Sequence, residues 1–388
     1  MLLRWIIVAL VAALAGFHAV RVAAVRDLPD GLGARLWPQH ARVLARKAMA
    51  EVGATAARQQ PLSPATMRLV AQVAREAPLA PEPFLIHGAL AQMAGRDAQA
   101  ERLFLAARAR DPRSEAARYF LADRFLRTGR TAAALAEMSA LSRLVPGATA
   151  QFAPALASFA RTPGAVPELR RFLRRSPEFE PAVLQELTKS PANAELVMSL
   201  WSQQRIGAGA APAWQASLLR GLVEARQYAR AQATWSRLAG AELKPGIYNP
   251  QFRRDPAPPP FNWSVPGVGG IVEPAPGGVQ IIYFGRQDVV LAEQLLLLAP
   301  GRYELAVSVR AGAGERNALA WTLKCDSSGS ELAALPLGGA ANARLTGKFE
   351  VPEGCPAQWL QLAGKAGEFS RSVELTMTGL ELRQDGQR

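Results

Sequence analysis

A spacing of 34 residues recurs in the Ala-, Leu- and Arg-rich first half of the chain and restricts what that half can fold into. Nine positions between 88 and 112 align with positions 34 residues later, and five of the nine pairs are identical. A period of this length is one helical hairpin, which cannot bury its apolar face alone and must stack on neighbouring copies. The small, aromatic and proline positions that define it are Gly88, Gly95, Ala100, Phe104, Ala107 and Pro112, then Ala122, Gly129, Ala134 and Pro146.

The residue types at these positions fit a helix–turn–helix unit. Small residues such as Gly88 allow two antiparallel helices to approach closely. Gly95 and Gly129 predict the turns between helices, because glycine adopts a positive φ at little cost. Phe104 fills the space against the next unit. Pro112 ends the second helix, since proline lacks the backbone donor and clashes with the preceding turn.

This pattern resembles the tetratricopeptide repeat family, most specifically over residues 81–148. The likeness weakens afterwards, where Thr162-Pro163-Gly164 interrupts the motif, and a further hairpin is expected near Trp214–Leu238. The resemblance implies an α-solenoid over residues 38–243. It also implies that the repeats bind a protein partner in a concave groove, although the motif names no groove residue.

The hydrophobic period changes to two after a Pro-rich segment, residues 244–260, that we interpret as a linker. Short alternating segments punctuated by Gly and Pro then predict an antiparallel β-sandwich over residues 261–384. A change in the phase of alternation near Gly379 suggests a β-bulge. The expected strands are 278–284, 289–298, 302–311, 317–325, 343–350, 357–363 and 372–382.

The second half resembles the jelly-roll carbohydrate-binding modules, also described as galactose-binding-like sandwiches. The segments that carry this resemblance are Asn249–Phe252, Pro260–Trp263, Ala299–Tyr303 and Trp321–Cys325. The resemblance implies a polysaccharide as a ligand of the sandwich. Such modules often place an acidic residue after the early Phe, near a structural calcium ion, but Arg253 stands there in this chain, and we expect no metal or other cofactor.

Alternation along the expected strand 357–363 distinguishes a glycan or partner contact from the core. Leu360 and Leu362 fall on the inner face, whereas Trp359 and Gln361 fall on the outer face. An outward Trp beside Gln can stack on a sugar ring. The alternative is that Trp359 packs under a loop or against the helical domain.

Residues 1–26 form a targeting segment, in which residues 5–25 are apolar apart from His18 and Arg21. We expect a membrane helix, with Arg21 reaching toward the interface, and a signal peptide cleaved near Val22-Ala23-Ala24 is the alternative. Basic residues just after the span favour a cytoplasmic location for the rest of the chain. The cysteines favour the opposite, a protein held in the inner membrane with its remainder in the periplasm.

Cys325 and Cys355 are the only cysteines and fall in the same predicted domain, which predicts a disulfide formed in an oxidising compartment. Closing a loop of about 30 residues would stabilise the fold by roughly 3–4 kcal/mol. Two buried free thiols are the alternative.

The formal net charge of +13 lies entirely in the helical half. Residues 247–388 hold 13 of the 45 basic and 14 of the 32 acidic residues, which leaves 32 basic and 18 acidic residues to positions 1–246. A solvated basic helix surface explains this excess, and an anionic polysaccharide or phospholipid surface is the alternative. Nucleic acid is not expected, because the segment contains no recognised reading motif.

The sequence lacks the clusters of residues that catalytic sites require. Three histidines are spread along the helical half, so neither a His-based metal site nor a Ser–His–Asp arrangement is expected. Paired carboxylates for glycoside cleavage could arise among Glu273, Asp288, Glu293 and Glu304, but nothing in the sequence places two of them across a cleft. The chain is therefore not expected to be an enzyme.

These observations together predict a membrane-anchored, non-catalytic scaffold of the cell envelope. Its repeats would bind a protein and its sandwich a glycan, in the assembly or export of a surface polysaccharide. The alternatives are a general protein-assembly adaptor with a purely structural β-domain and, as a third class, a glycan-active enzyme.

Overall fold

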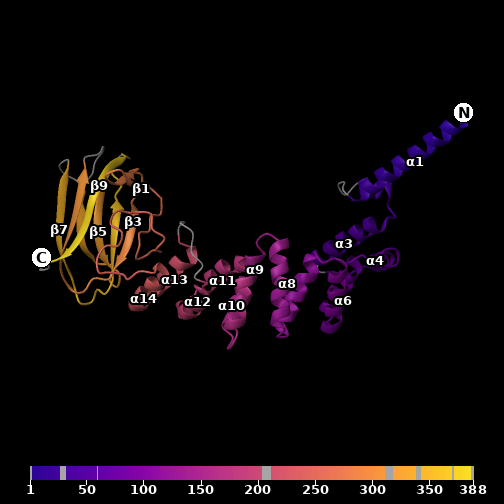
Figure 1. Cartoon of the computed structure of the whole chain (residues 1–388), viewed down its shortest axis with the longest axis horizontal. Coiled ribbons are helices and arrows are strands. Elements are labelled where there is room, and N and C mark those ends of the chain that lie inside the picture. The colour runs from indigo at the N-terminus through magenta and orange to yellow at the C-terminus, as the bar shows by residue number, and fades with distance from the viewer. Residues whose placement is uncertain are drawn as a thin grey trace. The chain divides into compact units, whose positions relative to one another are not determined.

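The computed structural model describes residues 2–26, 32–58, 60–202, 211–310, 318–337, 342–368 and 371–385 (Figure 1). The chain forms two compact units, Met1–Phe152 and Ala153–Arg388, and each is described by itself. Helices make up the first unit and the beginning of the second, and two antiparallel sheets come after them. The predicted order of an α-solenoid and then a β-sandwich is confirmed.

The first unit consists of an apolar helix followed by helical hairpins. Its helices are α1 (Leu2–Arg26), α2 (Leu32–Leu36), α3 (Ala41–Ala57), α4 (Pro64–Glu76), α5 (Glu82–Met93), α6 (Asp97–Arg110), α7 (Glu115–Arg127) and α8 (Thr131–Leu144), and the division between units falls within α9 (Ala148–Ala160). Side chains accept hydrogen bonds from backbone amides at two helix starts, Ser63 for α4 and Ser114 for α7. These caps satisfy donors that a helix leaves free at its N-terminus.

The 34-residue period corresponds to the hairpins α5–α6 and α7–α8. Gly88 is small because a Cβ atom there would lie 2.9 Å from Cε2 of Phe104. Phe104 in turn stacks on Phe120 of the next hairpin, with ring centroids 3.9 Å apart. Gly95 and Gly129 adopt φ values of +69° and +72° at the turns. The repeat signature is thus a set of packing contacts between successive helices.

Helix α1 is the one described helix that is long and apolar enough to cross a membrane. Its apolar window, Val8–Val25, has a mean hydropathy of 2.0, and its side chains are mostly exposed. Figure 1 shows α1 extending away from the hairpins of its unit. Its C-terminal end packs on protein: Val25 accepts a hydrogen bond from Arg46, and the Arg21 guanidinium lies 4.1 Å from the centroid of Trp37.

The second unit begins with shorter helices, three of which have a proline next to their first residue. They are α10 (Val166–Arg175), α11 (Glu180–Leu187), α12 (Ala194–Leu200), α13 (Ala213–Glu224) and α14 (Tyr228–Ala239), with single 3₁₀ turns at Pro177–Phe179 and Pro191–Asn193. α13 and α14 form the hairpin that the sequence indicates near Trp214–Leu238. Gly240 ends α14 with a φ of +66°.

The sandwich has a five-stranded and a four-stranded sheet, both antiparallel. The first has the order β1 (Gly270–Ala275), β2 (Gly278–Tyr283), β9 (Val373–Gln384), β4 (Gly301–Arg310) and β7 (Ala343–Val351). The second has the order β3 (Val289–Leu296), β8 (Gln358–Gly364), β5 (Leu319–Cys325) and β6 (Glu331–Pro336). One buried cluster, which includes Trp321, Leu323, Leu360 and Leu362, fills the space between the sheets.

Two strands fall outside the seven expected from the alternation. β1 contains a proline, and β6 is an Ala-rich edge strand with few buried side chains, so both give a weak pattern of period two. The bulge expected near Gly379 is present. The register between β4 and β9 shifts between Ser308 and Val309, which pair with Gly379 and Met377.

The Pro-rich segment between the helices and the sheets is packed rather than extended. Phe252 lies in the sandwich core and stacks on Trp263, with ring centroids 4.2 Å apart. Pro258 accepts a hydrogen bond from the indole nitrogen of Trp235 in α14, at 2.9 Å. Residues 244–260 therefore contribute side chains to the sandwich and backbone acceptors to the last helix.

Candidate functional site

An apolar groove on the first unit is the first candidate binding surface. Its cavity of about 370 Å³ is lined chiefly by the first helix of each hairpin, α3, α5 and α7. The lining residues are Met49, Val52, Leu85, Ile86, Ala89, Gln92, Phe104, Ala116, Phe120 and Asp123. Most of these side chains are apolar, and Met49 is 37% exposed. The groove can therefore remove an apolar segment of a partner from water.

The groove exists because the repeat signature keeps the helices close and leaves their first-helix faces uncovered. Ala89 and Ala116 are too small to fill the space, while Phe104 and Phe120 form its floor at the contact between hairpins. Of the lining residues only Phe104 belongs to the repeat signature, since the motif marks contacts within the solenoid. The signal that could have found the others is the apolar positions of α3, α5 and α7 that the motif does not use.

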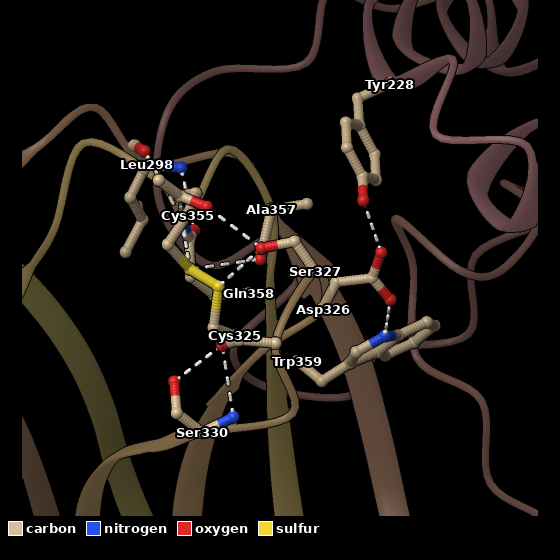
Figure 2. The surroundings of a disulfide bond; sticks show 12 residues. Tyr228, Leu298, Cys325, Asp326, Ser327, Ser330, Cys355, Ala357, Gln358 and Trp359 are labelled. Atoms are coloured by element: carbon tan, nitrogen blue, oxygen red, sulfur yellow. Dashed lines mark hydrogen bonds between the residues drawn. A yellow bond between two sulfur atoms is a disulfide. The ribbon is translucent and has the colours of Figure 1, made fainter.

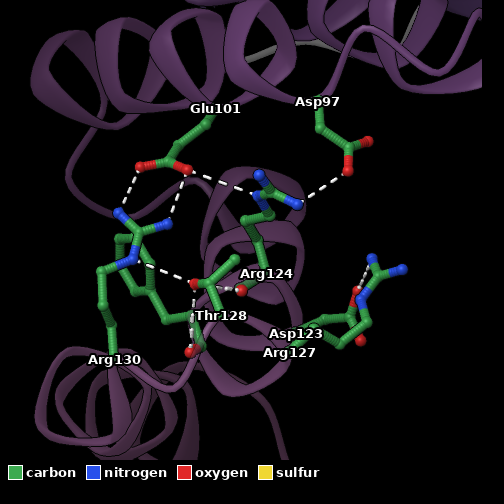
Figure 3. A network of polar contacts seen from close by, with 8 residues as sticks. Asp97, Glu101, Asp123, Arg124, Arg127, Thr128 and Arg130 are labelled. Carbon is green, nitrogen blue, oxygen red and sulfur yellow. Dashed lines mark hydrogen bonds and ion pairs between the residues drawn. The ribbon is translucent and has the colours of Figure 1, made fainter.

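Arginines of the same unit are bound by its carboxylates. Figure 3 shows Glu101 of α6 between Arg124 of α7 and Arg130 at the start of α8. Both terminal nitrogens of Arg130 donate to the Glu101 carboxylate, at 2.5 and 2.6 Å. Arg124 also donates to Asp97, at 2.7 Å. The hydrogen bond from Arg130 holds the pKa of the Glu101 carboxyl below its usual value.

A second carboxylate, Glu137 of α8, is buried between two arginines. Arg108 of α6 and Arg118 of α7 each donate to one of its oxygens, the latter at 2.6 Å. Both clusters join the hairpin of α5 and α6 to the next one. Four arginines of the basic excess, Arg108, Arg118, Arg124 and Arg130, are therefore used to hold repeats together rather than to form a solvated surface.

The junction between α14 and the sandwich is the second candidate surface, and it contains Trp359. Figure 2 shows Asp326, at the turn after β5, between Tyr228 of α14 and Trp359 of β8. The Tyr228 hydroxyl donates to one oxygen of Asp326 at 2.5 Å, and the Trp359 indole nitrogen donates to the other at 2.7 Å. Burial, together with the hydrogen bond to Asp326, raises the pKa of Tyr228 to about 12.

The structure places Trp359 and Gln361 on the face of β8 opposite the buried Leu360 and Leu362, as the alternation predicts. Both are half-buried. The Gln361 amide donates to Glu293 of the neighbouring β3 at 3.1 Å. The polar edge of Trp359 is occupied by Asp326, so the contact it makes in the structure is with the helix–sandwich junction. Neither Tyr228 nor Asp326 is marked by the sequence, because their contact spans 98 residues.

The Cys325–Cys355 disulfide lies directly beside this junction. It joins the end of β5 to the turn that precedes β8, with Cα atoms 5.6 Å apart. Ser327 donates to the Gly354 carbonyl at 2.9 Å, and Arg226 donates to the Ser327 carbonyl at 3.4 Å. The disulfide and these bonds fix the turn that presents Asp326 to α14.

The carboxylates considered for glycoside cleavage lie on separate strands and loops. Glu273 is on β1, Glu304 is on β4, and Glu293 on β3 belongs to the other sheet. Asp288 accepts a hydrogen bond from the Ala366 amide at 2.8 Å. Within the described residues, no group of three or more His, Cys, Asp or Glu side chains could hold a metal ion.

Comparisons with known proteins identify no family for the chain. No protein-family model matches it, and neither does any curated protein. Thirty chains of known structure are similar, including one described as "Crystal structure of APC/C hetero-tetramer Cut9-Hcn1". That chain is 16% identical, and the match covers 54% of this chain and 41% of that one, with a TM-score of 0.26. Such a score carries no argument about function.

Proposed function

We propose that this chain is a membrane-anchored, non-catalytic scaffold of the cell envelope whose helical repeats bind a protein partner. The observation that carries the proposal is the apolar groove formed by α3, α5 and α7. Its occupant would be an apolar segment of another protein, because the lining offers packing surface and few polar groups.

The groove proposal is tested by cross-linking. A photoreactive side chain at Leu85, which lines the groove, should yield one discrete adduct in intact cells. The substitution Ala89→Glu places a charge in the groove lining and should abolish the adduct. Ala109→Glu, at an exposed position of α6 outside the groove lining, is the matched control and should leave it unchanged. An adduct that survives Ala89→Glu would contradict the proposal.

Membrane anchorage is the second element of the proposal, and α1 supports it by length and hydropathy. A signal sequence would have the same properties, so the mature N-terminus must be determined. We expect an intact N-terminus and a chain that detergent, but not high salt, releases from membranes. A mature chain that begins near Ala24 would remove the anchor. The paired cysteines support a periplasmic location for the remainder.

A glycan remains a candidate ligand of the sandwich, in the assembly or export of a surface polysaccharide. Its support is the outer-face position of Trp359, whose ring is half-buried. Trp359→Ala should abolish retention on a polysaccharide column if the ring stacks on sugar. Unchanged retention, or no retention of the unaltered chain, would favour an adaptor with a structural sandwich.

A further inference from the structure

A second cavity of the first unit lies between α3 and α4. Unlike the apolar groove, it is lined mainly by charged and polar side chains. It measures about 590 Å³ and is lined by Lys47, Glu51, Ala65, Arg68, Leu69, Ala71, Gln72 and Arg75. Three of these eight residues are cationic and one is acidic. The cavity therefore presents an excess of positive charge at a concave site.

The three cations differ from the arginines that join the repeats, because no carboxylate of the described residues forms an ion pair with them. Lys47, Arg68 and Arg75 are all exposed. The Glu51 carboxylate accepts a hydrogen bond at 2.8 Å from the buried Thr66 hydroxyl. Nearby on α4, a carboxylate oxygen of Glu76 accepts a hydrogen bond from the side chain of Gln72. The cationic groups are thus available to an external anion.

Helix α3, which carries two residues of the cavity lining, also contacts the end of the apolar helix α1. Lys47 directly follows Arg46, which donates to the Val25 carbonyl of α1 at 3.2 Å. The 18-residue apolar window of α1 would be about 27 Å long, close to the roughly 30 Å hydrocarbon thickness of a bilayer. Its end carries the Arg21–Trp37 contact, and Trp is enriched where a protein meets the lipid headgroups.

We propose that the cavity between α3 and α4 binds the phosphate of an anionic phospholipid headgroup through Lys47, Arg68 and Arg75. A phosphate oxygen pair matches the planar donors of a guanidinium, and a third cation neutralises the remaining charge. The contact of α3 with the end of α1 selects a lipid as the source of the phosphate. This inference rests on the membrane anchorage proposed above.

The test uses the full chain in lipid discs of phosphatidylcholine alone and of an equimolar mixture with phosphatidylglycerol. Phenylglyoxal labels accessible arginines, and mass spectrometry gives the rate at each site. We expect Arg68 and Arg75 to be labelled several-fold more slowly in the anionic discs at low ionic strength. High salt should remove the protection, because the Debye length falls to about 3 Å at 1 M. Equal rates in both discs would overturn the proposal.

A charge-matched pair of variants separates the cavity from general attraction to the membrane. The combined substitution Lys47→Gln, Arg68→Gln and Arg75→Gln should weaken retention of phosphatidylglycerol in neutral detergent on the order of 100-fold, since each cation near an anionic surface contributes about fivefold.

The control variant combines Arg96→Gln, Arg102→Gln and Arg113→Gln, which are exposed positions of the same unit outside the cavity. It should retain the lipid, and an equal loss in both variants would refute the assignment. Protection by inorganic phosphate in neutral discs, without protection by phosphatidylglycerol, would also refute it. A chain that enters neither disc would disprove the anchor itself, and the lipid site with it.

Discussion

The bond network at Asp326 predicts that the last helix and the sandwich stabilise each other through one carboxylate. Asp326→Ala removes the acceptor of two hydrogen bonds, one from Tyr228 and one from Trp359. Hydrogen bonds to charged groups contribute about 1.5–3 kcal/mol when buried, and the partial exposure of these three side chains reduces this to about 1 kcal/mol each. We therefore expect the variant to lose about 2 kcal/mol of unfolding free energy.

A double-mutant cycle isolates the contact with the helix. Asp326→Ala and Tyr228→Phe are measured singly and together by denaturant unfolding, with tryptophan fluorescence as the probe. The coupling free energy between them should be about 1 kcal/mol, because the second substitution removes a bond that the first has already broken. Tyr303→Phe is the matched control, since its hydroxyl donates to the Ala299 carbonyl within the sandwich at 2.9 Å.

Additivity decides the outcome. Independent sites add within about 0.3–0.5 kcal/mol, and the Asp326–Tyr303 pair should do so. If the Asp326–Tyr228 pair were equally additive, the helix would not be held to the sandwich by this carboxylate, and the reasoning would fail. A loss from Asp326→Ala that Trp359→Phe alone reproduces in full would assign the energy to the sheet instead.

Three further outcomes are expected from packing, chain connectivity and titration. Reducing the disulfide should lower the unfolding free energy of the sandwich by about 3.6 kcal/mol, the chain-entropy value for a 30-residue loop, as denaturant titration with and without reductant can measure. Gly88→Ala should cost about 1–3 kcal/mol because its Cβ would press on Phe104, whereas Gly53→Ala, with nothing within 4 Å, should be neutral or stabilising in thermal melts. Stability should fall between pH 10 and about 12, since the raised pKa values of Tyr228 and Tyr248 favour folding only while the phenols are neutral, and Tyr228→Phe should lessen the fall.

Local patterns predict the parts of this fold that local contacts determine. The 34-residue period gives the hairpins α5–α6 and α7–α8, because the residues it relates, such as Gly88 and Phe104, touch within one hairpin. Alternation identifies the strands whose inner face is fully buried. It fails at β6, whose exposed Ala-rich sequence packs little against the core.

The candidate sites depend on contacts between distant segments, which no local pattern records. Alternation gives the face of Trp359 but not its partner, since Asp326 is 33 residues away and Tyr228 is farther still. The cationic cavity could not be predicted from the sequence for a related reason. Composition shows an excess of arginine, and only the structure separates arginines bound by Glu101 and Glu137 from those that line an open cavity.

The sharing of each acid by two bases makes the repeat stack unequally tolerant of change. Losing Arg108 or Arg118 still leaves Glu137 one counter-charge, so the buried group stays neutralised. Losing Glu137 leaves Arg108 and Arg118 close together without their shared counter-charge, so attraction between consecutive hairpins becomes repulsion. A scan of all single substitutions should therefore find that stability is sensitive to most substitutions of Glu137. Substitutions of Arg108 or Arg118 should be tolerated better.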